Sequence, residues 1–367
     1  NSTLLHMRSD VSVGSCLSGG LDSSALTYFA ASSLDERSFN TFTASFKNTA
    51  IDETHFAKLV SGPMPNISAH YTYPNENVFW KDFDKLIFHQ DLPIASSSIF
   101  AQWEVMKLAK KNNTKVLLDG QGADEALGGY SYFTGIYLIE LLKKLRFREF
   151  FNQSRKIKEN RSVSIFNELS RAYFSFLPHS TKAFFRENFC KGSQYLSKEF
   201  ISEHKNSKNL YVQTENSYIK KNISAIKYGM HELLRYEDRN SMAYSIESRV
   251  PFLDHNLVEL SLKIPFKYKI KSGWTKYILR KSIENKVNDK VVWRKDKKGF
   301  VTPQGEWKNN LRKELIEYIE KSNVPEFIDK DFLISQTNKD IKNATELSEY
   351  WKMISIVKWI EIFNIKF

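Results

Sequence analysis

A glycine turn near the N-terminus, set between an apolar run and a helical segment, is the feature that most constrains the fold. The apolar run covers 11–17, the turn begins at Ser18, and helical composition follows over 23–31. This order predicts a strand, a tight turn and a helix. Strands that alternate with helices predict an α/β fold with a mainly parallel, twisted sheet and helices on both faces. Further strands are predicted at 39–46, 70–73 and 116–119, and further helices at 52–60 and 98–111.

The strand signal fades after Tyr130, and the rest of the chain is predicted to be mostly helical. Aromatic and basic residues recur at roughly helical spacing over 133–160, 163–191 and 222–240. The change in composition divides the chain into an α/β core, a helical insertion and a mostly helical final part, packed together as one unit. These parts cover 1–135, 136–225 and 226–367.

The composition narrows the class of protein. No run approaches the roughly 18 consecutive apolar residues of a membrane helix. The two cysteines, Cys16 and Cys190, give neither a disulfide framework nor a metal-binding spacing, and 1–10 lacks a secretory signal, so a cytoplasmic protein is predicted. The net charge of +12 leaves two alternatives, a nucleic-acid-binding surface or a solvated surface whose positive field suits phosphate-rich ligands. We favour the solvated surface.

The first turn has the residues of a phosphate-binding loop. Glycines allow the backbone close to a phosphate, and successive N–H groups at a helix N-terminus supply positive potential. The common mononucleotide loop would end in Gly-Lys-Ser/Thr, whereas here an aspartate, Asp22, follows the glycines. A carboxylate ~4 Å from a phosphate costs about 4 kcal/mol at an effective dielectric near 20, so a cation, Mg²⁺, is implied between them. The alternative is a plain turn with Asp22 as helix N-cap. The string is Ser18-Gly19-Gly20-Leu21-Asp22-Ser23-Ser24.

A second glycine turn follows the predicted strand at 116–119 and again opens a helix. Its Gly120-Gln121-Gly122 suggests a dinucleotide fingerprint, but Glu125 stands where the third glycine belongs. Two acids beside a pyrophosphate would repel it without a metal ion, which argues against that interpretation. The full string is Leu118-Asp119-Gly120-Gln121-Gly122-Ala123-Asp124-Glu125, with Gly128-Gly129-Tyr130 behind it.

Two later segments are dense in charge. The first, 234–254, contains Ser241-Met242-Ala243, Glu247-Ser248-Arg249 and Val250-Pro251-Phe252-Leu253-Asp254. The second combines Trp274-Thr275-Lys276-Tyr277-Ile278-Leu279-Arg280 with a basic stretch at 292–300. Taken alone, their charged residues suit surface ion pairs and solvated loops as well as a binding site.

Together, and in this order, these strings resemble the synthetase domain of the asparagine synthetase family, from about His6 to Trp307. The resemblance implies an adenine nucleotide α-hydrolase-like fold that cleaves ATP to AMP and pyrophosphate. It makes 1–135 the ATP-binding core and 226–367 the substrate and catalytic part. In the family, the β-carboxylate of aspartate is adenylated and ammonia then displaces AMP, so asparagine or a related amide is the expected product.

The resemblance also assigns roles to individual residues. Lys276 is implied to stabilise negative charge on the α-phosphate and the tetrahedral intermediate. Some members carry a glutamate at the position of Gln121 that helps to deprotonate the amine, and glutamine cannot act as that base. In the β-lactam synthetase branch a glutamate aligned with Glu237 belongs to the base dyad, so Glu237 is the expected substitute. The implied Mg²⁺ ligands are Asp22 and Asp124, and the implied ATP-binding residues are Leu17, Ser18, Gly19, Gly20, Asp22, Ser23, Ala44, Asp119, Gly120 and Lys298.

Several alternatives stay open. A β-lactam synthetase, peptide cyclase or sugar-acid amidotransferase would share the scaffold. Gln121, which stands where some family members have a glutamate, leaves these candidates open. A tRNA-modifying ATP-pyrophosphatase and an inactive binding module are less favoured. Family members usually carry an N-terminal glutaminase domain, which we expect in the full-length protein or in trans as the source of ammonia. A homodimer is also compatible with the resemblance.

Overall fold

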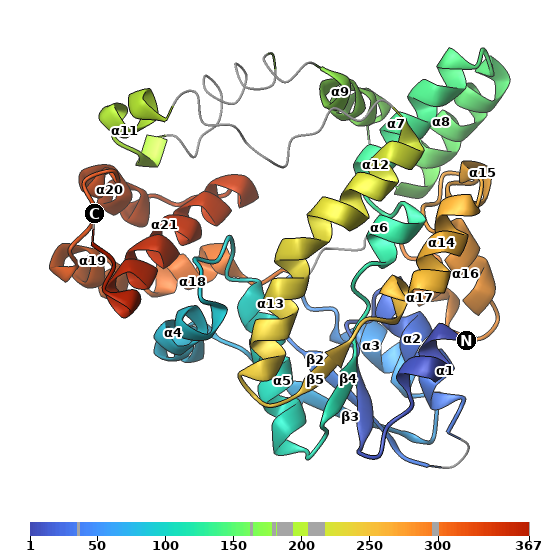
Figure 1. The fold of residues 1–367 in the computed structure, drawn as a ribbon, viewed down its shortest axis with the longest axis horizontal. Coiled ribbons are helices and arrows are strands. Elements are labelled where there is room, and N and C mark those ends of the chain that lie inside the picture. Colours follow the sequence, from blue (N-terminus) through green and yellow to red (C-terminus); the bar gives the residue numbers. More distant parts are fainter. Residues whose placement is uncertain are drawn as a thin grey trace.

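A five-stranded parallel sheet organises the molecule (Figure 1). The computed structural model describes residues 1–34, 37–161, 164–177, 181, 194–204, 217–295 and 301–366. The strand order is β3-β2-β1-β4-β5, and every neighbouring pair is parallel. The strands are β1 Val13–Cys16, β2 Phe39–Ala44, β3 Ile67–Thr72, β4 Val116–Leu118 and β5 Glu247–Arg249. The predicted α/β fold with a parallel sheet is therefore confirmed.

The four strands predicted from apolar runs are all present, whereas β5 was not predicted. Its three residues, Glu247–Arg249, contain no apolar side chain, so no hydropathy pattern marks them. They form a strand because β4 offers a free edge, with Val116 paired to Glu247 and Leu118 to Arg249. A charged strand three residues long is also typical of a sheet edge.

Helices cover both faces of the sheet, as expected for parallel strands connected by crossovers. On one face α2 (Leu21–Ala31) and α3 (Thr54–Ser61) pack in a cluster with Leu17. On the other face α5 (Ile99–Lys111) and α13 (Met230–Met242) pack with Phe42 and Leu117. These helices lie close to the predicted ranges.

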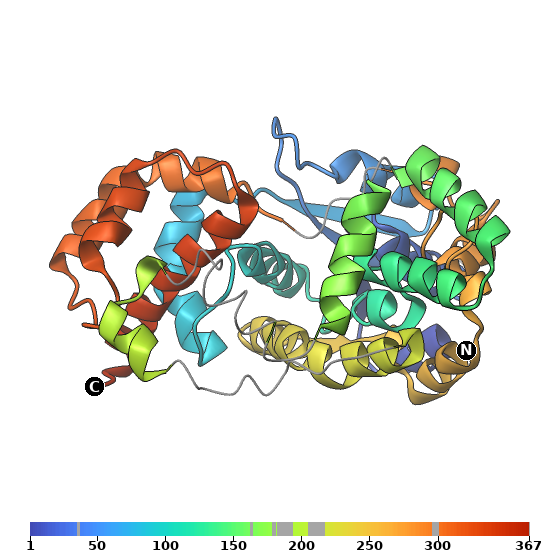
Figure 2. The same cartoon turned by 90° about the horizontal axis from the view of Figure 1, so that it is seen from above.

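A second group of helices packs around α4 (Glu76–Gln90) and enlarges the core. Helix α4 itself was not predicted from the sequence. Asn75 accepts a hydrogen bond from the Val78 N–H at 3.0 Å and so caps this helix. Phe79 of α4 stacks on Trp307, with ring centroids 5.2 Å apart. Figures 1 and 2 place this group at one end of the molecule. Its other helices are α18 Gln304–Asn310, α19 Arg312–Lys321, α20 Lys330–Asn338 and α21 Ala344–Phe363.

The opposite end of the molecule is also helical (Figure 2). Aromatic residues such as Phe133 and Tyr218 build a separate hydrophobic cluster there. The predicted helical stretches are confirmed where the structure describes them, and part of 163–191, including Cys190, lies outside the described residues. The helices outside the first two groups are α1 Ser2–His6, α6 Ala123–Leu127, α7 Ser131–Lys143, α8 Phe147–Arg161, α9 Ile165–Phe176, α11 Lys198–Glu203, α12 Tyr218–Ser224, the π-helix η2 Ala225–Gly229, the 3₁₀ helix η3 Pro251–Leu253, α14 His255–Lys263, α15 Phe266–Lys269, α16 Tyr277–Ile283 and α17 Asp289–Val292.

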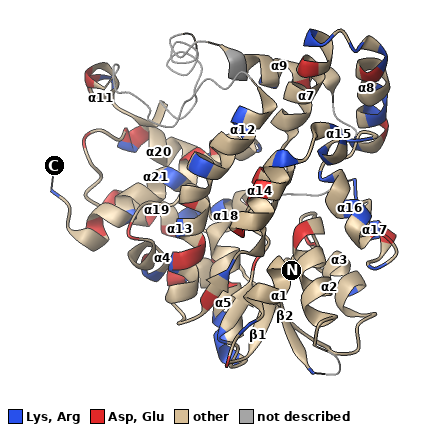
Figure 3. Ribbon diagram, turned by 45° about the vertical axis from the view of Figure 1, so that its right-hand side comes forward, with Lys and Arg blue, Asp and Glu red and all other residues tan. Residues whose placement is uncertain are grey.

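Basic and acidic residues are interspersed along the helices in the view of Figure 3, and no broad face of a single sign stands out there. Many of these charges pair within one helix, as Lys156 does with Glu159 and Lys321 with Glu317. Among the described helices, none combines the length and the apolar character that crossing a membrane requires.

The strand order fixes where a ligand can bind. From β1 the chain crosses to β2 on one side, whereas β4 lies on the other side of β1 and leads on to β5. Loops that leave β1 and β4 therefore diverge, and in parallel α/β sheets ligands typically bind at such a point, outside the carboxyl ends of the strands. Both glycine turns found in the sequence lie at this position.

Candidate active site

The first turn is held against the sheet by its own backbone. The Leu17 N–H donates to the Phe42 carbonyl at 2.9 Å, and the Thr43 hydroxyl donates to the Leu17 carbonyl at 2.6 Å. Gly19 has a φ of +72°, and a Cβ at this position would lie 2.6 Å from the Ala57 nitrogen. Only glycine satisfies both the left-handed backbone and the close approach of α3.

Serine side chains stabilise the same turn from within. The hydroxyls of Ser18 and Ser23 hydrogen-bond at 3.0 Å, and the Gly20 N–H donates to the Ser18 hydroxyl at 3.3 Å. Gly20 is the N-cap of α2, and Asp22 lies buried in the first helical turn. The alternative that Asp22 caps the helix is therefore wrong, because the N-cap position belongs to Gly20.

The second turn lies directly against the first. A Cβ added to Gly120 would lie 3.2 Å from the Asp22 Cβ, so this glycine marks the closest approach of the two turns. Gly122, the N-cap of α6, has a φ of +90° and packs against the Leu253 side chain. The Val-Pro-Phe-Leu-Asp string thus supports the second turn from behind.

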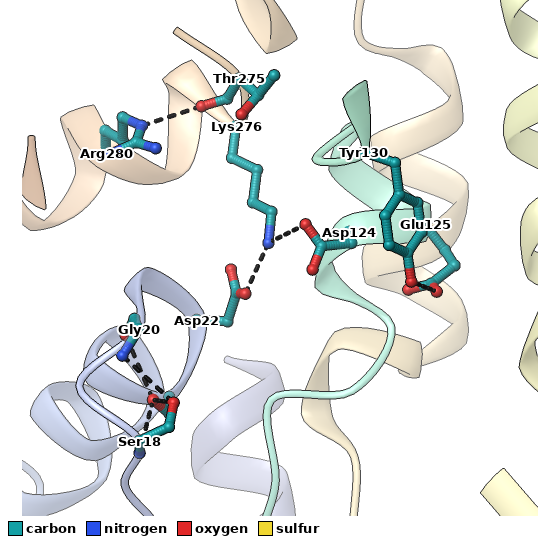
Figure 4. Close-up of polar contacts among 10 residues, drawn as sticks. Ser18, Gly20, Asp22, Asp124, Glu125, Tyr130, Thr275, Lys276 and Arg280 are labelled. Atoms are coloured by element: carbon teal, nitrogen blue, oxygen red, sulfur yellow. Dashed lines mark hydrogen bonds and ion pairs between the residues drawn. The ribbon is translucent and has the colours of Figure 1, made fainter. Parts of the chain in front are cut away.

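Lys276 connects the acids of the two turns. Its Nζ lies 2.6 Å from the Asp22 Oδ2 and 2.5 Å from the Asp124 Oδ1 (Figure 4). The lysine is only 3% exposed. A Cβ at Gly129 would lie 1.7 Å from the Asp124 Oδ1 and 2.2 Å from the Lys276 Cε, so a bare backbone is required beside this cluster. The three side chains come from segments far apart in the sequence and meet at one point.

Arg280, one turn after Lys276 on α16, braces that segment. Its Nε donates to the Thr275 carbonyl at 3.0 Å (Figure 4), and its guanidinium lies 4.7 Å from the centre of the Trp274 ring. Burial lowers the pKa of Arg280 to about 10, while the nearby Asp22 and Asp124 oppose that shift. The group therefore remains a cation at neutral pH and adds positive potential behind Lys276.

The two aspartates fit Mg²⁺ bound together with a nucleotide. Mg²⁺ is held in such sites by one or two carboxylates, while phosphates and water complete its coordination. Asp22 and Asp124 supply two carboxylates near the N-terminus of α2. Among the described residues, no group of three or more His, Cys, Asp or Glu is placed to hold a metal ion without further ligands. The donor set thus suits a metal that arrives with phosphates.

A second acidic cluster lies beneath the Asp119 end of the second turn. The Asp119 carboxylate accepts hydrogen bonds from the Gln102 side chain and from the backbone of Gly120 and Gln121. Burial raises the pKa of Asp119. This residue therefore fixes the turn to α5.

Glu237 belongs to this second cluster. It is 2% exposed and accepts a hydrogen bond from the Ser248 hydroxyl. Burial and the charge of Asp119 raise its pKa well above the ordinary carboxyl range, and burial likewise raises the pKa of the Cys16 thiol beside both acids. The Glu237 Oε2 is buried and has no hydrogen-bond partner among the described residues. One oxygen of the carboxyl group is thus left without a hydrogen bond in the interior.

A cavity of about 240 Å³ adjoins the other side of α6. Glu125, 3% exposed, accepts a hydrogen bond from the Tyr130 hydroxyl at 2.5 Å at its wall, and burial raises the pKa of Glu125. Lys221 and the π-helix η2 line the same space. The sequence did not predict this cavity, because η2 carries no recognisable pattern. Turns of π-helix often occur at functional sites.

The structure brings together most of the residues expected to bind ATP. Leu17, Ser18, Gly19, Gly20, Asp22 and Ser23 form the first turn, Asp119, Gly120 and Gln121 form the second, and Asp124 and Lys276 lie between them. Ala44 ends β2, the strand next to β1. Glu237 lies on the Asp119 side of the second turn. Lys298 lies outside the described residues.

The fold and the site define an α/β domain in which two glycine turns, at the carboxyl ends of neighbouring parallel strands, bring a pair of carboxylates together. A model of the protein family described as asparagine synthase matches residues 1–361. The chain therefore belongs to the asparagine synthase family, whose members are ATP-dependent enzymes that form carbon–nitrogen bonds. The resemblance seen in the sequence is confirmed.

Curated relatives agree with this assignment. The chain is 30% identical to the glutamine-hydrolyzing asparagine synthetase 1 of Bacillus subtilis (strain 168), over 99% of its own length and 58% of that protein. It is 28% identical to asparagine synthetase 2 of the same organism, over 78% of this chain and 36% of that protein. It is also 24% identical to the amidase chry2 of Gibberella zeae, over 87% of this chain and 54% of that protein. The chain thus covers between 36% and 58% of the length of these three relatives.

Proposed function

We propose that this chain adenylates a carboxylate with ATP, releasing pyrophosphate, and transfers the acyl group to ammonia, with aspartate as the substrate and asparagine as the product. The observation that supports this proposal is the meeting of Asp22, Asp124 and Lys276 where two glycine turns touch. Two carboxylates and a cation at a helix N-terminus suit the β- and γ-phosphates of a nucleotide with its metal ion.

Each turn has a proposed task. The backbone N–H groups of Gly19 and Gly20 and the hydroxyls of Ser18 and Ser23 would bind the pyrophosphate. The backbone around Asp119 and Gly120, with Leu17 and Ala44, would contact the adenosine. Mg²⁺, held by Asp22 and Asp124, would neutralise charge on the leaving pyrophosphate. Lys298, although outside the described residues, remains a candidate flank for that group.

Lys276 would provide the main electrostatic stabilisation. A buried ammonium directed at the α-phosphate favours the charge that accumulates there as the substrate carboxylate attacks and pyrophosphate leaves. The same ammonium would then stabilise the oxyanion formed when the amine adds to the acyl-adenylate. Its enclosure supports this role, because a cation shielded from water interacts more strongly with developing charge.

Glu237 is the proposed base for the amine, because Gln121 has no carboxylate. A raised pKa brings a carboxyl group closer to the pKa of a useful base near neutral pH, and the buried Oε2 atom has no hydrogen-bond partner among the described residues. Ser248, which donates to the other oxygen, would hold the carboxylate in place.

The direct test is an assay with purified protein, ATP, Mg²⁺, aspartate and ammonium. We expect AMP and pyrophosphate in equal amounts, together with asparagine, measured by chromatography. Formation of ADP and phosphate would refute the mechanism, since it would place the bond cleavage at the γ-phosphate.

A related amide former is a second candidate, and two observations favour it. Gln121 departs from the glutamate of some family members, and a fungal amidase is among the relatives. A screen of carboxylates by pyrophosphate exchange would separate the candidates. Aspartate-dependent exchange supports the first, and exchange with another carboxylate alone supports the second. The relatives that hydrolyse glutamine also suggest that a glutaminase unit supplies the ammonia.

A further inference from the structure

We propose that Lys276 is the resident cation of the Asp22–Asp124 pair when no nucleotide is bound, so that its ammonium and a divalent metal ion exclude each other from this position. The inference rests on the proposed function in taking the two aspartates as the metal ligands. It adds that the metal site is closed by the protein's own side chain until a nucleotide arrives.

The positions of three atoms carry the first step. The Lys276 Nζ contacts the Asp22 Oδ2 at 2.6 Å and the Asp124 Oδ1 at 2.5 Å. A Mg²⁺ ion bound to both of these oxygens would lie roughly 2.0–2.1 Å from each, and it would overlap the space of the ammonium. One cation can therefore occupy the place between the carboxylates, but not two.

The residues around Lys276 hold its side chain in this position. Lys276 is 3% exposed, and its Cε would lie 2.2 Å from a Cβ built on Gly129. The bare backbone of Gly129 thus makes room for the lysine stem as well as for Asp124. A surface lysine that happened to approach an acid would need no such space.

Nucleotide binding gives the ammonium a new partner. Lys276 is the N-cap of α16, with a φ of +49°, so it stands at the junction of a loop and a helix rather than inside either. The phosphates of an incoming nucleotide would attract the ammonium by charge and at the same time supply ligands to a metal ion. We expect the metal to enter with the nucleotide and Lys276 to move from the aspartates to a phosphate.

Metal binding to the nucleotide-free protein tests the inference, with Mn²⁺ as the probe and electron paramagnetic resonance as the measurement. Mn²⁺ binding by the wild-type protein at this site should lie at the limit of detection. Lys276→Met, which keeps an unbranched chain without the charge, should bind it about tenfold more tightly or better, because a neighbouring charge of this kind shifts such equilibria by roughly 1–3 powers of ten. Equal affinities would overturn the inference.

Lys281→Met is the matched control. Lys281 lies on the same helix, its side chain is 47% exposed, and it pairs with Glu284. This variant removes the same charge without opening the aspartate pair, so its Mn²⁺ affinity should stay at the wild-type value. An equal gain in both variants would show a general charge effect and would contradict the inference. Adding Asp22→Asn to Lys276→Met should abolish the gain.

A third variant covers the case in which Lys276→Met does not fold. Asp22→Asn alone should leave the Mn²⁺ affinity of the nucleotide-free protein unchanged, because Lys276 already excludes the metal there. A clear loss of affinity would show that the aspartates bind metal without nucleotide. None of these assays contains ATP or a substrate, so a failure here and a failure of the AMP and pyrophosphate assay can be told apart.

Discussion

At the residue scale, Asp22 lies in the first helical turn of α2 and supplies one of the two carboxylates that contact Lys276. The side chain is not the N-cap of α2, so helix formation does not depend on it. We therefore expect function and folding to separate at this position.

Asp22→Ala should reduce pyrophosphate exchange by about a hundredfold or more, because charge compensation at a reacting phosphate is lost. The circular dichroism spectrum should stay that of the wild type. Exchange at the wild-type rate would show that Asp22 holds no metal needed for the reaction, and a lost spectrum would assign it a structural role instead.

Glu237→Gln should spare pyrophosphate exchange and slow amide formation, because exchange needs no base for the amine. Quantifying both activities in one preparation gives the comparison. If the substitution abolishes exchange as well, the proposed role of Glu237 as the amine base is wrong.

The same substitution predicts a pH dependence of stability. Glu237 has a raised pKa in the folded state, so between the ordinary carboxyl range and that raised pKa the folded protein binds more protons than the unfolded chain. Its contribution to stability is therefore complete at low pH and is lost as the pH rises. Glutamine does not titrate, so at pH 7 the Glu237→Gln protein should have a larger free energy of unfolding than the wild type.

Urea unfolding at several pH values checks this prediction. The difference in free energy of unfolding between the two proteins should shrink toward zero below pH ~4, where both states of the wild type carry the proton. A difference that does not change with pH would show that Glu237 has an ordinary pKa in the folded protein.

At the scale of the elements, two short helices, α12 and α15, hold the C-terminal end of α6. The carbonyl of Ala126 near the end of α6 accepts a hydrogen bond from the buried Lys269 at 3.0 Å, and the Lys269 Nζ also donates to Asn222 at 2.7 Å. Orphan carbonyls at a helix C-terminus are thus satisfied by side chains from α15 and α12. The helix that carries Asp124 is in this way fixed at its far end.

The π-helix η2 allows a test of whether a co-substrate of the proposed reaction uses the cavity beside Glu125. Gly229 lines the cavity, and a Cβ built on it would meet no atom within 4 Å, so Gly229→Leu adds a side chain at the cavity wall where the Cβ has open space. We expect the KM of the co-substrate that uses the cavity to rise about tenfold, while the KM of ATP is unchanged.

Steady-state kinetics with aspartate, ammonium and ATP varied in turn would measure this effect, with Gly229→Ala as the smaller control. Helix stability should not suffer, since glycine in a helix interior is itself unfavourable. If all three KM values equal those of the wild type, no co-substrate occupies the cavity.

At the scale of the whole molecule, one hydrophobic cluster joins the sheet to the last helices of the chain. Trp307 of α18 is 2% exposed and packs against Phe46, Phe79 and Phe100. Residues from 1–135 and from 226–367 thus share one core.

Trp307→Ala should lower the free energy of unfolding by roughly 3–5 kcal/mol, the usual cost of deleting a large buried aromatic side chain. Because the cluster spans both parts, we expect the variant to unfold in a single transition at lower urea, followed by fluorescence and circular dichroism together. Two separate transitions would show that the C-terminal helices unfold independently of the sheet.

The sequence by itself determined the parallel sheet and the two turns, because apolar runs and obligatory glycines are local signals. Gly19 and Gly122 are needed by their own backbone angles, and the same glycines mark the two turns of the candidate site. The tertiary structure decided the rest. Strand β5 exists only because β4 has an edge, and the Lys276 ammonium meets Asp22 and Asp124 only after folding closes chain separations of more than a hundred residues. Contacts between distant segments depend on packing of the whole chain, which no local pattern records.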